Sequence, residues 1–218
     1  MLQFLCLRKS MPDKNNNAPV SGSIPDDYQE ILHWKLTEKP IQVIVLQIVG
    51  IILFVIFGLI LFRIAIGVGK LPSHLPLGLS EIGILMLGSL LTLILHELLH
   101  GMAMRMFGAK PKYGILLKQL MFYTTTLGYA YRRDQYLAIA LAPLVVLSVV
   151  VILGMGLLSG TFWVALLALC GAINASGAIG DIWMSLIVLR YPRAAYVVDE
   201  RDGIRVFMQE INLDQVNH

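Results

Sequence analysis

Long apolar blocks separated by short polar segments dominate the chain. A helix needs roughly 20 apolar residues to cross a bilayer, and four blocks reach that length, so the pattern predicts four transmembrane helices. Two of the blocks carry no charged residue, and each of the other two carries a single acid, Glu97 in one and Asp181 in the other. The blocks are Ile41–Phe62, Ile82–Met104, Tyr136–Leu158 and Thr161–Leu189.

The composition supports a small membrane protein that crosses the bilayer several times. Of the 218 residues, 57% are apolar and 14% are charged, whereas a soluble domain carries about 25% charged residues. A net charge of +3 does not indicate nucleic acid as a partner. Two cysteines are too few for a disulfide framework or a cysteine-built zinc site.

The basic residues predict the orientation in the membrane. Of the 17 Lys and Arg residues, all but Arg63 and Lys70 precede the first block, lie between the second and third, or follow the fourth. The positive-inside rule then places both termini and the second loop in the cytoplasm of a cell-membrane protein. We divide the chain into a cytoplasmic flexible lead-in (1–39), a four-helix transmembrane domain (40–190) and a cytoplasmic tail (191–218).

Two polar segments favour β-structure. Aromatic and β-branched residues between Gly114 and Gly128 predict a small hairpin close to the membrane, between the second and third helices. Residues 196–207 surround Asp202-Gly203, which is typical of a tight hairpin turn. The expected fold class is an all-α membrane protein with four transmembrane helices, a membrane-proximal hairpin and a short tail.

The second block contains His96-Glu97-Leu98-Leu99-His100. Histidines four residues apart lie on one helical face, one turn from each other, and that spacing lets both imidazoles bind one zinc ion. Glu97 stands beside them and is placed to take a proton from a water molecule that the metal activates. Three ionisable residues within five positions are costly inside a bilayer without a ligand, which favours a metal centre over a chance match.

A catalytic zinc usually has three protein ligands and one open position, so a third ligand must come from elsewhere. The other acids between residues 40 and 190 are Glu81, Asp134 and Asp181, and His74 is a further candidate in the outer loop. Glu81 lies near the outer end of the second helix. Asp134 adjoins two arginines and is more simply a paired surface charge.

Depth in the membrane favours Asp181. His96 precedes Arg105 by nine residues, and Asp181 precedes Arg190 by nine. At 1.5 Å per residue, both side chains then lie about 13 Å from the cytoplasmic ends of two parallel helices.

Small and polar residues form a stripe on each of these two helices, which allows close approach and hydrogen bonds between them. Asn174 lies above Asp181 on its stripe. It is a candidate to bind substrate or to support the metal site, with an ordinary interhelical hydrogen bond as the alternative. The two stripes are Ser89, Thr92, His96, His100 and Ala103, and Asn174, Ala178, Asp181 and Ser185.

Three segments form a recognisable pattern: His96-Glu97-Leu98-Leu99-His100-Gly101, then Arg133-Asp134-Gln135-Tyr136 running into Ala140-Leu141-Ala142-Pro143, then Asn174 to Gly180-Asp181. The pattern resembles a family of bacterial membrane proteins described as "putative zincin peptidases". That family is similar to the site-2 proteases, which are intramembrane zinc metalloproteases. Site-2 proteases usually show Asn-x-x-Pro and Asp-Gly motifs, whereas here Gly177 replaces the proline and Ile182 follows Asp181.

The resemblance implies a Zn²⁺ ion held by His96, His100 and Asp181, with Glu97 as general base. It also implies hydrolysis of a peptide bond, in a peptide or membrane-protein substrate, within or near the lipid bilayer. The alternative is a zinc-binding membrane protein without hydrolytic activity, such as a metal transporter or a structural partner. A membrane scaffold with structural histidines is a third interpretation.

Overall fold

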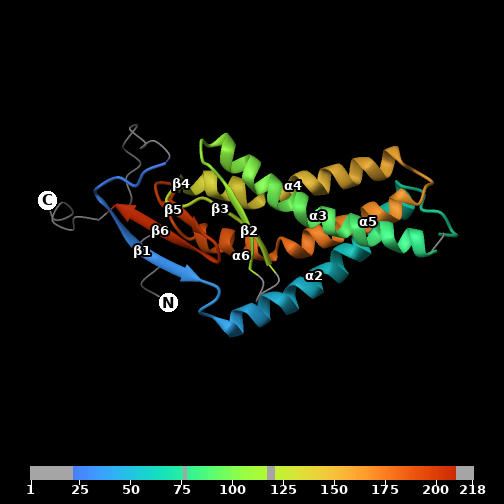
Figure 1. Cartoon of the computed structure of the whole chain (residues 1–218), viewed down its shortest axis with the longest axis horizontal. Helices are drawn as coiled ribbons and strands as arrows, with labels where there is room; N and C mark the ends of the chain where they lie inside the picture. The colour runs from blue at the N-terminus through green and yellow to red at the C-terminus, as the bar shows by residue number, and fades with distance from the viewer. Residues whose placement is uncertain (1–21, 76–77, 117–120, 210–218) are drawn as a thin grey trace.

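Helices and strands account for most of the chain that the computed structural model describes, which is residues 22–75, 78–116 and 121–209. The helices lie together as an elongated bundle, with the larger sheet at one end (Figure 1). The helices are α2 (Pro40–Gly67), α3 (Leu79–Met106), α4 (Arg133–Leu157), α5 (Trp163–Gly177) and α6 (Ile179–Val188). The strands are β1 (Tyr28–Lys35), β2 (Lys112–Leu116), β3 (Met121–Thr125), β4 (Ala130–Arg132), β5 (Tyr196–Glu200) and β6 (Gly203–Gln209).

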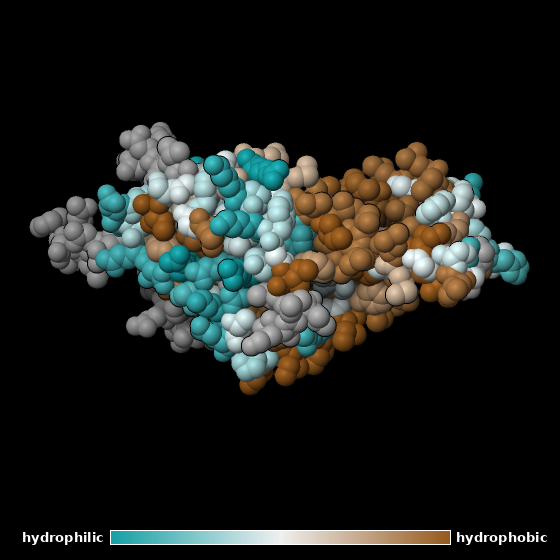
Figure 2. All heavy atoms as spheres, in the orientation of Figure 1, coloured by the Kyte–Doolittle hydropathy of each residue, from teal (hydrophilic) through white to brown (hydrophobic). Residues whose placement is uncertain are grey.

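Four helical segments of the described chain are long and apolar enough to cross a membrane: α2, α3, α4 and the consecutive pair α5 and α6. Many of their large apolar side chains point outwards, among them Leu59 of α2 and Leu153 of α4, both 63% exposed. Figure 2 shows apolar surface over the helices and polar surface over the sheet end. This distribution is consistent with a membrane protein and matches the four predicted helices.

Segments from both ends of the described chain build a four-stranded antiparallel sheet in the order β1-β6-β5-β4. The expected all-α class with one hairpin is therefore corrected: two sheets accompany the helices, and β1 lies within the expected lead-in. Strand β1 pairs with β6, which follows more than 160 residues later. Because its partner strand is so far away in the chain, β1 can be predicted from the sequence only through its own β-branched and aromatic residues.

Both segments that the sequence predicts to contain strands do form paired strands. In the tail, β5 pairs with β6 and Glu200 lies opposite Gly203, which confirms the hairpin. Its turn is Arg201-Asp202 rather than the predicted Asp202-Gly203, because Gly203 is the first residue of β6. Strands β2 and β3 pair antiparallel, with Lys112 opposite Thr125. Strand β3 also contacts α3, so this pair of strands is held against the second predicted transmembrane helix.

The predicted fourth helix is interrupted at Ala178. Helix α5 ends at Gly177 and α6 begins at Ile179, although the Ile182 amide still donates to the Ala178 carbonyl at 2.9 Å. Glycines at positions 177 and 180 weaken the helix there. The interruption places Asp181 in the first turn of α6, where the amide end of a helix favours a negative charge.

A buried cluster joins the sheet to the helices and lies beside the candidate site described below. It contains apolar side chains from α3, α4, α6 and all four strands of the larger sheet, so the sheet and the ends of the helices pack as one unit. Its most buried large members are Tyr131, Ile139, Val188, Val197, Ile204 and Val206.

Candidate metal centre

The two histidines of the predicted motif lie on one face of α3. The helix runs without a break from Leu79 to Met106, so residues four apart are one turn from each other. The rings of His96 and His100 lie 4.9 Å apart between centroids, and each residue is only 7% exposed. Both imidazoles therefore point into the protein rather than towards the apolar outer surface.

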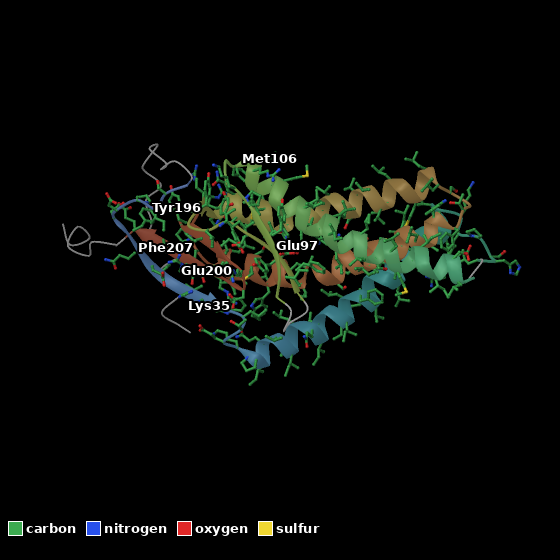
Figure 3. The ribbon with its side chains drawn as sticks, viewed as in Figure 1. Lys35, Glu97, Met106, Tyr196, Glu200 and Phe207 are labelled. Atoms are coloured by element: carbon green, nitrogen blue, oxygen red, sulfur yellow. The ribbon has the colours of Figure 1, made fainter. Side chains whose placement is uncertain are left out.

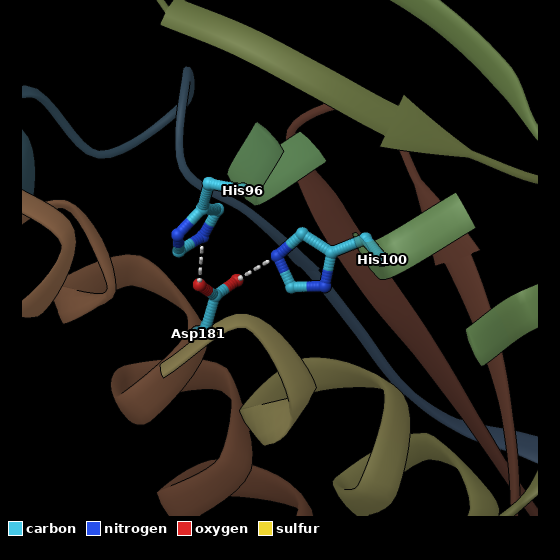
Figure 4. A group of neighbouring side chains, drawn as sticks. All are labelled: His96, His100 and Asp181. Atoms are coloured by element: carbon cyan, nitrogen blue, oxygen red, sulfur yellow. Dashed lines mark hydrogen bonds and ion pairs between the residues drawn. The ribbon is translucent and has the colours of Figure 1, made fainter. Parts of the chain in front are cut away.

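Asp181 of α6 meets both rings. Its Oδ2 lies 3.0 Å from Nε2 of His96, and its Oδ1 lies 3.3 Å from Nε2 of His100 (Figure 4). The ligand atoms of the three residues lie within 4.8 Å of one another. The structure thus brings together the three residues that the sequence singles out as metal ligands, from helices more than 70 residues apart.

Partners on the far side of each ring determine which nitrogen faces Asp181. Nδ1 of His96 lies 2.9 Å from Oδ1 of Asn174, and Nδ1 of His100 lies 3.0 Å from the carbonyl oxygen of Ile139. These oxygens accept hydrogen bonds, so each ring donates from Nδ1 and turns Nε2 towards Asp181, where a metal would bind. Asn174 therefore supports His96 from behind.

The chemistry of these donors fits a zinc ion. Two neutral imidazole nitrogens and one carboxylate match the His₂-carboxylate sets of catalytic zinc sites, which leave a position open for water or substrate. Each imidazole is hydrogen-bonded at its other nitrogen, as metal-binding histidines usually are. His100 and Asp181 also line a cavity of about 140 Å³. An open coordination position on the metal would face this cavity.

Glu97 lies next to the three ligands, where α3 passes strands β2 and β3 (Figure 3). The hydroxyl of Thr124 on β3 lies 2.8 Å from Oε2 of Glu97 and 3.0 Å from its carbonyl oxygen. Glu97 also lines the cavity beside His100 and a second, largely apolar cavity of about 290 Å³. Its carboxylate is therefore oriented by β3 and accessible from both cavities.

The other candidate ligands lie away from this group. Glu81 occupies the first turn of α3, at the opposite end of the helix from Arg105. Asp134 pairs with Arg133 at 2.8 Å and approaches Arg193 at 3.7 Å, which confirms that it is a paired surface charge. His74 is exposed in the segment between α2 and α3.

A third acidic group at the site, after Glu97 and Asp181, is not apparent from the sequence. Asp199 of β5 lines the cavity with Glu97, His100 and Asp181. Its Oδ2 is buried and has no hydrogen-bond partner among the described residues, and burial raises the pKa of this carboxyl to about 7. Within the sequence, Asp199 is simply one polar position in a predicted tail hairpin.

Thr124 is missed for a similar reason. It stands first in a run of three threonines after Phe122-Tyr123, and such a run is typical of any strand. Thr125 and Thr126 have other partners, the carbonyl of Asp199 and the hydroxyl of Tyr131. Only the packing of β3 on α3 distinguishes the three.

Comparison with known proteins agrees with this site. Residues 89–196 match the model of a family described as "Putative zincin peptidase", and the match includes His96, Glu97, His100, Asn174 and Asp181. An "Uncharacterized 24.7 kDa protein in gap 5'region" of Pyrococcus woesei is 30% identical over 120 residues, which is 53% of this chain. The alignment covers 51% of that protein, so the chain spans about half of its length. No solved structure matches the chain.

Proposed function

We propose that this chain, whose residues 89–196 match the family described as "Putative zincin peptidase", is a multi-pass membrane zinc metallopeptidase. In this proposal it hydrolyses peptide bonds within or near the bilayer, as site-2 proteases do. The observation that carries the proposal is the convergence of His96, His100 and Asp181, with ligand atoms within 4.8 Å of one another. Glu97 stands beside these ligands on the same helix.

The residues of the chain have separate roles in this chemistry. Zinc, when bound, acts as a Lewis acid that activates water and polarises the scissile carbonyl. Glu97 accepts the proton of the attacking water and passes it to the leaving amine, as a general base and then a general acid. Thr124 holds the Glu97 carboxylate, while Asn174 and the Ile139 carbonyl hold the two imidazoles.

An extended peptide is the expected substrate. A peptide bond within a helix is shielded by the helix's own hydrogen bonds, whereas strands β2 and β3 offer a surface for strand addition. The apolar cavity beside Glu97 is lined by Ile94 and Leu98 of α3 and by Ile115 of β2. It therefore suits an apolar side chain of a substrate lying along these strands.

A charged side chain introduced into the apolar cavity tests whether this cavity binds substrate. Ile115→Asp is expected to raise KM for an apolar peptide with little change in zinc content. Leu127→Asp is the matched control, because Leu127 is exposed and outside both cavities. Equal KM values for the two variants would remove the cavity from the proposal.

We also propose an orientation in the membrane, in which both termini and the segment between α3 and α4 lie in the cytoplasm. The sheet that joins β1, β4, β5 and β6 supports this, because these strands flank the helices at one end of the bundle (Figure 1). In a cysteine-free background, an impermeant maleimide should label Lys70→Cys in intact cells and Lys110→Cys only after lysis. The reverse pattern would contradict the orientation.

The activity itself is tested with full-length protein purified in detergent. We expect about one zinc per chain in wild type, Glu97→Gln and Asp134→Asn, and none in His96→Ala. A peptide library read by mass spectrometry should be cleaved by wild type and Asp134→Asn only. Cleavage by Glu97→Gln would disprove the mechanism, and zinc without cleavage in wild type would favour the non-hydrolytic alternative.

A further inference from the structure

The hydrogen bond behind His100 uses a backbone carbonyl from the middle of a helix. Ile139 lies within α4, six residues after its first residue Arg133, and is 2% exposed. Its carbonyl oxygen nevertheless lies 3.0 Å from Nδ1 of His100 on α3. In a regular α-helix, such a carbonyl accepts the amide hydrogen of the residue four positions later.

The residue four positions later is Pro143, which has no amide hydrogen. The Ile139 carbonyl consequently has no helical donor. It is also buried, where a carbonyl without a hydrogen bond is unfavourable. The His100 ring supplies the donor that the helix cannot, and this requires the hydrogen on Nδ1.

The same turn of α4 also approaches the support of the other histidine. The carbonyl oxygen of Pro143 lies 3.4 Å from Nδ2 of Asn174, and Oδ1 of that asparagine accepts from His96. Pro143 is itself buried on the face of α4 that carries Tyr136, Ile139 and Ala140. Both imidazoles are thus supported from one face of this helix.

We propose that Pro143 is a positioning residue for the metal centre. By lacking an amide hydrogen, it frees the Ile139 carbonyl to hold His100 in the tautomer and orientation that present Nε2 to the metal. The inference rests on the zinc site of the proposed function. It assigns to this proline a role beyond bending a transmembrane helix.

The test restores the missing donor. Pro143→Ala provides an amide hydrogen for the Ile139 carbonyl, and alanine is a better helix former than proline. The new helical bond competes with His100, so the affinity for zinc should fall about 10-fold or more, as for other residues that support metal ligands. Affinity is measured by chelator competition on the purified full-length protein.

Pro40→Ala is the matched control. Pro40 lies at the start of α2, where the first amides of a helix have no internal acceptor in any case. Its replacement therefore adds an amide without closing a buried helical bond, and zinc affinity should not change. Equal affinities of Pro143→Ala and wild type, with helix content retained, would overturn the inference.

A second measurement does not depend on either variant folding. In metal-free wild type, ¹⁵N-histidine spectra should show a hydrogen on Nδ1 of His100, as its bond to the Ile139 carbonyl requires, with His100→Asn identifying the signal. The opposite tautomer would overturn the inference. If wild type binds no zinc, the proposed function fails, whereas the tautomer still reports on the bond between His100 and Ile139.

Discussion

Thr124 of β3 and Glu97 of α3 are joined side chain to side chain, with Oγ1 of the threonine 2.8 Å from Oε2 of the carboxylate. The same hydroxyl lies 3.0 Å from the carbonyl oxygen of Glu97, so its single hydrogen is shared between the two acceptors. The contact ties the proposed general base to a strand that lies 27 residues later in the chain. In the proposed mechanism, β3 therefore positions the general base in addition to binding substrate.

Thr124→Val removes this donor and nearly preserves the shape of the side chain. Because a hydrogen bond to a charged group contributes about 1.5–3 kcal/mol, kcat for peptide hydrolysis should fall about 10-fold or more. Thr124→Ser should retain most of the activity, since it keeps the hydroxyl. Zinc content, measured in parallel, should not change in either variant.

Thr126→Val is the control for this prediction. The Thr126 hydroxyl bonds to Tyr131 and not to Glu97, so its loss affects packing near the sheet rather than the base. Equal kcat values for Thr124→Val and Thr126→Val would show that the contact with Glu97 is irrelevant to the reaction.

Asn174→Ala should weaken zinc binding. The change removes the acceptor at Nδ1 of His96, and loss of such a support typically costs about 10- to 100-fold in metal affinity. Asn174→Asp keeps an acceptor and should restore much of it. Ser176→Ala is the control in the same helix, because the Ser176 hydroxyl donates to the Ile173 carbonyl within α5. Chelator competition measures all three, and wild-type affinity in Asn174→Ala would refute the assignment.

Asp199 should make the metal-free protein less stable as the pH rises. Burial raises the pKa of its carboxyl from 3.8 to about 7 in the folded protein. Below pH 4 the carboxyl is protonated in both the folded and the unfolded protein, so it does not lower the free energy of unfolding. Between pH 4 and pH 7 the unfolded protein has lost this proton while the folded protein still holds it, so the free energy of unfolding falls as the pH rises. Above pH 7 the accumulated loss is at most about 4 kcal/mol, at about 1.4 kcal/mol per unit of pKa difference.

Asp199→Asn therefore should raise the thermal midpoint of the metal-free protein at pH 8 and change it little at pH 4. Asp134→Asn is the control, because Asp134 is exposed and paired with Arg133. An Asp199→Asn midpoint that exceeds wild type by the same amount at both pH values would indicate a change in packing rather than a titration.

Gly203→Ala should detach β1 from the sheet. A Cβ at Gly203 would collide with the backbone carbonyl oxygen of Trp34 in β1, and Gly203 pairs directly with Lys35. Since no side chain can move to relieve a backbone collision, amide hydrogen exchange in β1 should accelerate. Gly67→Ala is the control, because no atom lies within 4 Å of a Cβ there. Unchanged exchange in Gly203→Ala would disprove the close packing.

Several features were predictable because they depend only on local periodicity and on the bilayer as solvent. Apolar blocks about 20 residues long predict the four helices. The spacing of His96 and His100 predicts one helical face. The scarcity of acids in the blocks leaves Asp181 as the candidate third ligand at the same depth, and the structure brings its carboxylate to both rings.

The remaining features were decided by tertiary structure alone, because they depend on contacts between segments that share no local pattern. Pairing of β1 with β6 joins the two ends of the described chain. Packing of β3 on α3 selects Thr124 rather than the threonines beside it. The bond from His100 to Ile139 uses a backbone carbonyl, which every residue has, so the residue type at position 139 does not indicate it. Its role becomes visible only when α4 lies against His100.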